Sequence, residues 1–183
     1  MSSPNNQKSQ KGQKGQRGQV RYRASRLTMA ALMAALALIF SYVEAILPLS
    51  VGIPGVKLGV ANLVVLIALY RLSFRYALSI NLVRILVAGL LFSGLFGALY
   101  ALAGGVLSLL VMEALRRTKL FSMVGVSMAG GVAHNLGQLL VAAAVVENLG
   151  MLVYLPILLF SGMTSGILIG IVAYYVEKRL PTL

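Results

Sequence analysis

The stretch Phe74-Arg-Tyr-Ala-Leu-Ser-Ile-Asn-Leu-Val-Arg-Ile-Leu-Val-Ala-Gly-Leu-Leu-Phe-Ser93 decides the fold class of this chain. It is 20 residues long and contains two charged side chains, Arg75 near its start and Arg84 near its middle. A helix of about 20 residues, rising about 1.5 Å per residue, crosses the hydrocarbon core of a bilayer. Because lipid offers backbone groups no hydrogen-bond partner, such a segment has to be helical. The stretch therefore predicts a transmembrane helix.

The composition of the whole chain agrees with that prediction. Of its 183 residues, 59% are hydrophobic and 11% are charged, and the mean hydropathy is +0.90. A soluble domain typically carries about 25% charged residues, so this chain could not cover a water-facing surface. Cysteine is absent, which excludes disulfides, zinc thiolates and cysteine nucleophiles.

Further apolar segments repeat the pattern on both sides of residues 74–93. They cover 27–47, 56–71, 95–115, 122–146 and 152–176. Most have the length of a membrane span, and the short second segment would be shielded by its neighbours. We predict an all-α integral membrane protein whose transmembrane domain, residues 27–183, contains six transmembrane helices.

Lysine and arginine gather on alternating sides of these segments. Seven lie in residues 1–26, and seven more flank the later segments: Arg71, Arg75, Arg116, Arg117, Lys119, Lys178 and Arg179. The opposite junctions, 48–55, 93–95 and 147–151, contain none. Cytoplasmic loops carry the excess of Lys and Arg, so we expect both termini in the cytoplasm of a multi-pass protein of the cell membrane.

Residues 1–26 form a basic tail with seven cations and no acid. Its run Gln10-Lys-Gly-Gln-Lys-Gly-Gln-Arg-Gly-Gln19 has almost nothing apolar to bury, which predicts disorder. The cations could contact anionic lipid headgroups, each worth about 1 kcal/mol. We expect no nucleic-acid partner, because no aromatic residues beyond Tyr22 are interleaved with the charges. We also expect no signal peptide, since the apolar run that follows is long and has no clear cleavage site.

Arg84 has no topological purpose, because it lies within an apolar segment. A charge at the centre of a membrane helix costs about 2.5–3.5 kcal/mol even on the lenient insertion scale. Asn81 lies one turn away on the same face, so this face points into the bundle. Two interpretations stay open: a buried ion pair that locks the bundle, or a group that binds an anionic substrate.

Lys57 and Glu44 flank a predicted loop on the extracytoplasmic side. Two prolines and two glycines within 48–55 cannot continue a helix. Lys57 either extends its ammonium group to the headgroups or faces a ligand beneath the loop. Glu44 is the expected charge partner of Lys57 or Arg84.

Further polar side chains lie in the second and fifth segments. His134, Asn135 and Gln138 share a turn and must face protein or a cavity, as must Asn62. They form either an interhelical hydrogen-bond cluster or one wall of a ligand site. A metal site is not expected, because a single His without Asp or Cys is a poor ligand set.

Small residues mark two helix faces. Gly162, Gly166 and Gly170 form a ridge that predicts close packing inside the bundle. Ala30, Ala31, Ala34 and Ala35 give two overlapping Ala-xxx-Ala pairs that suit either a partner helix or internal packing.

Missing motifs argue against catalysis by this chain. There is no phosphate-binding Gly-x-x-x-x-Gly-Lys-Ser/Thr motif, so the chain cannot be its own ATPase. Aspartate is absent, which excludes an Asp-rich magnesium site for diphosphate chemistry and a Ser-His-Asp triad. We expect neither enzymatic activity nor a cofactor.

Four motifs occur together in order. They are Gly52-Ile-Pro-Gly-Val-Lys57-Leu-Gly-Val-Ala-Asn62-Leu-Val-Val-Leu66, Asn81-Leu-Val-Arg84-Ile-Leu86, Ala103-Gly-Gly-Val-Leu-Ser-Leu-Leu110 and Gly131-Val-Ala-His134-Asn135-Leu-Gly-Gln138. With them, residues 28–177 resemble the bacterial Gx transporter family, commonly labelled "heptaprenyl diphosphate synthase component I". That family is similar to the S components of energy-coupling-factor transporters, which bind a vitamin-like substrate beneath the loop between helices one and two.

The resemblance implies partners as well as a substrate. S components dock through an Ala-xxx-Ala patch on helix one to a membrane coupling subunit, which two ATPase subunits drive. It thereby places Ala30, Ala31, Ala34 and Ala35 at a docking patch and 48–57 in the gating loop. We expect a substrate-binding subunit of such an importer, with a small, anionic or vitamin-like ligand. Its site would contain Lys57, Asn62, Asn81, Arg84, His134, Asn135 and Gln138. The alternatives are a non-catalytic membrane component of heptaprenyl diphosphate or quinone synthesis, and a structural scaffold.

Overall fold

The computed structural model describes residues 4–46 and 59–180, with side chains from residue 19 onward. Within these ranges the chain is helical and contains no strand. The α-helices are α1 (Pro4–Ile46), α2 (Val60–Arg71), α3 (Phe74–Ala88), α4 (Gly94–Thr118), α5 (Met123–Val145) and α6 (Leu155–Arg179). A π-helical turn, η1 (Gly89–Ser93), joins α3 to α4, and a 3₁₀ segment, η2 (Leu149–Tyr154), precedes α6.

The prediction of an all-helical membrane protein is confirmed in its coarser form. Four helical runs in the described ranges are long and apolar enough to cross a membrane: Gln19–Ile46, Phe74–Thr118, Met123–Val145 and Leu149–Arg179. The fifth run, α2, is shorter. Six separate membrane spans are therefore not reproduced, because α3, η1 and α4 follow one another as a single run of 45 residues.

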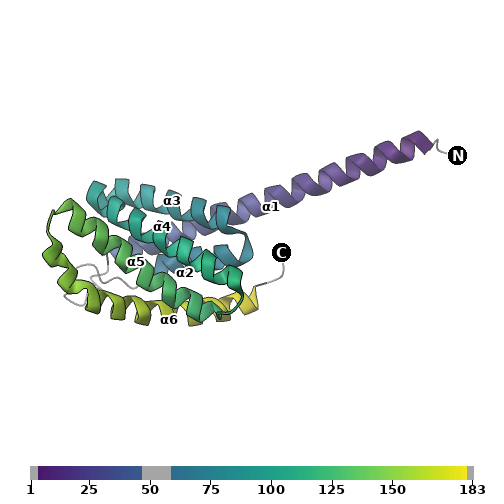
Figure 1. Cartoon of the computed structure of the whole chain (residues 1–183). Coiled ribbons are helices and arrows are strands. Elements are labelled where there is room, and N and C mark those ends of the chain that lie inside the picture. Colours follow the sequence, from purple (N-terminus) through teal and green to yellow (C-terminus); the bar gives the residue numbers. More distant parts are fainter. Residues whose placement is uncertain (1–3, 47–58, 181–183) are drawn as a thin grey trace.

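The chain turns within that long run at Gly94. This residue has φ 68° and ψ 176°, a combination that glycine tolerates because it lacks a Cβ. Beyond the turn, α4 packs back against α3, and the two helices lie side by side in Figure 1. The approach is close, since a Cβ on Gly89 would lie 2.6 Å from the Cβ of Ala98.

The first helix includes residues 4–26 of the basic tail, for which the sequence predicts disorder. The first helix begins at Pro4 and runs without a break to Ile46. In Figure 1 its N-terminal half projects away from the other helices. Gln, Lys and Arg have good helix propensity, and lengthening an existing helix avoids the cost of nucleating a new one.

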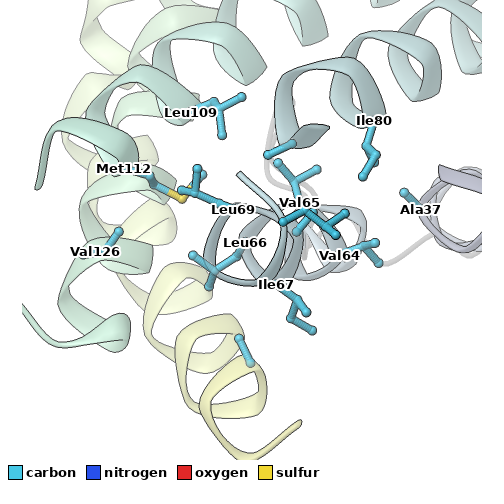
Figure 2. Packing of buried hydrophobic residues seen from close by; sticks show 14 of the residues in the cluster. Ala37, Val64, Val65, Leu66, Ile67, Leu69, Ile80, Leu109, Met112 and Val126 are labelled. Atoms are coloured by element: carbon cyan, nitrogen blue, oxygen red, sulfur yellow. The ribbon is translucent and has the colours of Figure 1, made fainter. Parts of the chain in front are cut away.

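The short helix α2 lies at the centre of the bundle. The exposed fraction is 2% or less for four of its residues, Val64, Val65, Leu66 and Leu69. They pack among side chains of the neighbouring helices, including Ala37, Ile80, Leu109, Met112 and Val126 (Figure 2). Contact with several neighbouring helices explains why α2 is apolar over most of its circumference, with Asn62 as a polar exception.

Charged side chains hold both ends of α2. At its start, the backbone N–H of Val60 donates to Oε1 of Glu44 on α1 at 2.6 Å. At its end, Arg26 of α1 donates to the carbonyl of Leu72. Arg71 Nη2 donates to the carbonyls of Glu177 at 2.8 Å and Leu180 at 2.7 Å. An acid at the start and bases at the end also match the helix dipole.

The predicted packing of the glycine ridge is confirmed. Gly162, Gly166 and Gly170 are buried and face α5. A Cβ on Gly166 would lie 2.7 Å from the carbonyl oxygen of Ser127, and one on Gly170 would lie 2.7 Å from Cα of Val124. Real Cβ atoms do not approach backbone this closely, so α5 and α6 require glycine at these positions.

Candidate functional site

Three polar side chains from three helices meet around Arg84, and together with it they form what we call the Arg84 cluster: Ser41, Asn62, Asn81 and Arg84. Arg84 Nη2 donates to Oδ1 of Asn81 at 2.8 Å and to Oδ1 of Asn62 at 3.5 Å. Arg84 Nη1 donates to Oγ of Ser41 at 3.4 Å. The cluster therefore ties α1, α2 and α3 together around one guanidinium.

Arg84 and Asn81 are buried, whereas Ser41 and Asn62 are half-buried. The exposed fraction of Arg84 is 9% and that of Asn81 is 1%. The spacing of three residues puts Arg84 and Asn81 on one face of α3, as the sequence predicts. Arg84 faces the protein, so a positive charge in this apolar helix is hydrogen-bonded instead of exposed to lipid.

Two donor nitrogens of the cluster lack a hydrogen-bond partner. Neither Nε of Arg84 nor Nδ2 of Asn81 has a hydrogen-bond partner among the described residues. Buried donors without a partner are costly, and they are uncommon in folded proteins. Nδ2 of Asn81 packs against the backbone of Gly105, so the donor that suits an anionic ligand is the Nε–H of the positively charged Arg84.

Glu44 does not form the expected ion pair with Arg84. Its carboxylate accepts the hydrogen bond from Val60 N and acts on Arg84 only through longer-range Coulomb attraction. The ion pairs between described side chains join Arg71 to Glu177, and Arg116 and Arg117 to Glu113. Glu44 is therefore a helix cap first, because the start of α2 has exposed N–H groups that attract a carboxylate.

The polar residues of α5 form a second group. Asn135 Nδ2 donates to the carbonyl of Leu158 in α6 at 2.7 Å. His134 and Gln138 lie against Gly104, where a Cβ would be 3.1 Å from Nδ1 of His134 and 2.8 Å from Cγ of Gln138. Asn135 thus bonds neighbouring helices together, as the interhelical interpretation of this turn predicted.

The backbone of α4 lies between the two groups. Gly105 contacts Asn81 of the Arg84 cluster, whereas Gly104 contacts His134 and Gln138. The predicted set of ligand residues is therefore divided: Asn62, Asn81 and Arg84 come together, and His134, Asn135 and Gln138 come together elsewhere. Lys57 and the whole of the predicted gating loop 48–57 lie outside the described residues.

The four alanines of α1 do not share one environment. Ala30 is buried at 8% exposure and belongs to the hydrophobic core, and half-buried Ala34 packs against that core. Ala31 and Ala35 are exposed. Of the two alanine pairs, Ala31 and Ala35 are thus open to a partner.

Sequence reasoning missed two contributors to the Arg84 cluster. Ser41 supplies a hydroxyl, although its position one turn before Glu44 on α1 could have indicated it. Gly105 supplies the space that Asn81 occupies. The adjacent glycines Gly104 and Gly105 separate the two polar groups, and this function depends on the three-dimensional arrangement of α3, α4 and α5.

In comparisons with curated proteins and with solved structures, nothing matched this chain. A family model described as "Heptaprenyl diphosphate synthase component I" matches residues 33–176. The match covers residues 33–46 of α1, all of α2 to α5 and most of α6, and so includes both polar groups. The chain belongs to the heptaprenyl diphosphate synthase component I family.

Proposed function

We propose that this protein is the substrate-binding membrane subunit of an importer of the energy-coupling-factor type, and that it takes a small anionic molecule into its helical bundle. The observation that carries the proposal is the Arg84 cluster. It presents a buried positive charge with an open Nε–H, held by neutral acceptors from three helices. A purely structural arginine would have its donors satisfied by the bundle itself.

The proposed topology has six crossings with both termini in the cytoplasm. The run Phe74–Thr118 would extend about 68 Å if it were straight, more than twice the roughly 30 Å of a hydrocarbon core. Since α4 packs back on α3 after Gly94, each of the two is proposed to cross once. The Lys and Arg residues at the junctions then all face the cytoplasm.

The proposed partners are a membrane coupling subunit and its ATPase subunits. Ala31 and Ala35 are exposed on α1, where small side chains allow another helix to approach closely. The chain itself has no phosphate-binding loop, so the energy for import would come from those subunits.

A second candidate follows from the family description. The match to a heptaprenyl diphosphate synthase component favours a membrane subunit that assists a prenyltransferase. Catalysis would then belong to the other component, because this chain contains no aspartate to hold magnesium around a diphosphate.

Affinity purification of the tagged full chain from its native membranes tests the two candidates. For an importer subunit, we expect a coupling subunit and ATPases among the co-purifying proteins, and a small anion by mass spectrometry. Arg84→Lys should lose the anion and keep the proteins, while Arg75→Lys, at an exposed position of the same helix, should keep both. Recovery of a prenyltransferase without ATPases would favour the second candidate.

A further inference from the structure

The Arg84 cluster carries little positive charge for a site in apolar surroundings. Arg84 is its one cation, and Ser41, Asn62 and Asn81 are neutral. The carboxylate of Glu44 acts on Arg84 and also neutralises part of the positive dipole at the start of α2. Among the described residues, the positive charge available to a ligand is therefore that of Arg84, because the carboxylate of Glu44 is bound to the start of α2.

The open donors define how an anion could bind. Nε–H and one N–H of Nη2 lie on the same edge of a guanidinium, the edge that a carboxylate can engage with both oxygens. Nε is open, and the Nη2 contact with Asn62 is the longest in the cluster at 3.5 Å. A carboxylate on this edge needs to replace only that weak contact, while the 2.8 Å bond to Asn81 stays in place.

Charge then separates two classes of ligand. A single carboxylate adds one negative charge, which the positive charge of Arg84 can balance. A diphosphate adds two or three, and the excess would remain unpaired in a poorly solvated site. We infer that the Arg84 cluster recognises one carboxylate group of its ligand, bound across Nε and Nη2, and does not accept a diphosphate. This inference rests on the proposed function for its biological meaning, but it concerns the chemistry of the cluster alone.

Nuclear magnetic resonance of the arginine side chains tests the inference. The full chain, labelled with ¹⁵N-arginine and purified in detergent, is titrated separately with acetate and with inorganic pyrophosphate at equal ionic strength. Acetate is small enough to enter a site built for a larger acid. Arg84→Lys assigns the Nε–H signal of Arg84, and Arg75→Lys assigns that of an exposed arginine on the same helix.

We expect acetate to shift the Arg84 Nε–H signal saturably, and pyrophosphate to act at least about tenfold more weakly. The Arg75 signal should follow ionic strength only. The inference is overturned if pyrophosphate shifts the Arg84 signal as strongly as acetate, if neither anion shifts it, or if Arg75 responds in the same way. If acetate shifts the signal saturably but no ATPases co-purify with the protein, the carboxylate site is supported and the importer proposal is contradicted.

Discussion

The side-chain amide of Asn81 lies directly against the backbone of Gly105. A Cβ on Gly105 would be 2.8 Å from Nδ2 and 3.4 Å from Oδ1 of Asn81. The same Oδ1 accepts the shortest hydrogen bond of Arg84. The position of the guanidinium on α3 therefore depends on the absence of a side chain at residue 105 of α4.

Gly105→Ala should move Asn81 and weaken its bond to Arg84. Overfilling a packed site of this kind costs about 1–3 kcal/mol of unfolding free energy. The acetate response of the Arg84 Nε–H signal should fall together with thermal stability in detergent. Gly125→Ala is the matched control, because its added Cβ would lie 3.7 Å from the nearest atom, Oγ of Ser122. Wild-type stability and acetate response in Gly105→Ala would show that Asn81 does not position Arg84.

Glu44 should act mainly as a cap of α2. Removing a helix cap costs about 0.5–2 kcal/mol, so Glu44→Ala should lower the free energy of unfolding by about that amount. Glu44→Gln keeps an oxygen that can accept from Val60 N, and it should lose less than half as much. Glu147→Gln, an exposed acid on the connection to η2, serves as the control. Equal losses in Glu44→Ala and Glu44→Gln would indicate that the charge matters more than the cap.

The double variant Arg84→Met with Glu44→Gln tests the structural interpretation of Arg84. It removes both charges, so no uncompensated buried charge remains and the bundle should fold. If Arg84 binds the ligand, the co-purifying anion should disappear from this variant. Full retention of that anion, measured by mass spectrometry of the purified protein, would assign Arg84 a structural function only.

Arg71 should fix the end of α6 through carbonyl groups more than through its ion pair. Its Nη2 bonds to the carbonyls of Glu177 and Leu180 are 2.7–2.8 Å long, whereas its Nε lies 3.6 Å from a partly exposed Glu177 carboxylate. Partly exposed ion pairs contribute about 0–1 kcal/mol. Arg71→Met should therefore speed amide hydrogen exchange over residues 176–180, and Glu177→Gln should change it little. Equal acceleration in the two variants would assign the anchoring to the ion pair.

Apolar run lengths were enough to place most of the helices. The segments predicted at 122–146 and 152–176 coincide closely with α5 (Met123–Val145) and α6 (Leu155–Arg179). The contact between Asn81 and Arg84 follows from helix periodicity alone, because both residues lie on α3. These successes share one cause, since each depends on a single helix.

Contacts between helices were harder to predict. The division of the polar residues by Gly104 and Gly105 depends on how α3, α4 and α5 rotate about their axes. Apolar helices that contact neighbours or lipid on every side have no polar face to reveal that rotation. The cap formed by Glu44 joins residues 16 positions apart and depends on how α1 and α2 meet.

The adjacent residues Ala30 and Ala31 of α1 should differ in how much stability is lost when each is replaced by leucine. Ala30 is buried in the core, so Ala30→Leu should overfill it and lower the free energy of unfolding by about 1–3 kcal/mol. Ala31 is exposed, so Ala31→Leu should change stability by less than about 0.5 kcal/mol.

If a coupling subunit docks on this face, Ala31→Leu should also reduce the recovery of that subunit in affinity purification. The acetate response at Arg84 should survive in Ala31→Leu, because the exposed alanine makes no contact with the Arg84 cluster. Normal recovery of the coupling subunit with Ala31→Leu and with Ala35→Leu would place the docking surface on another helix.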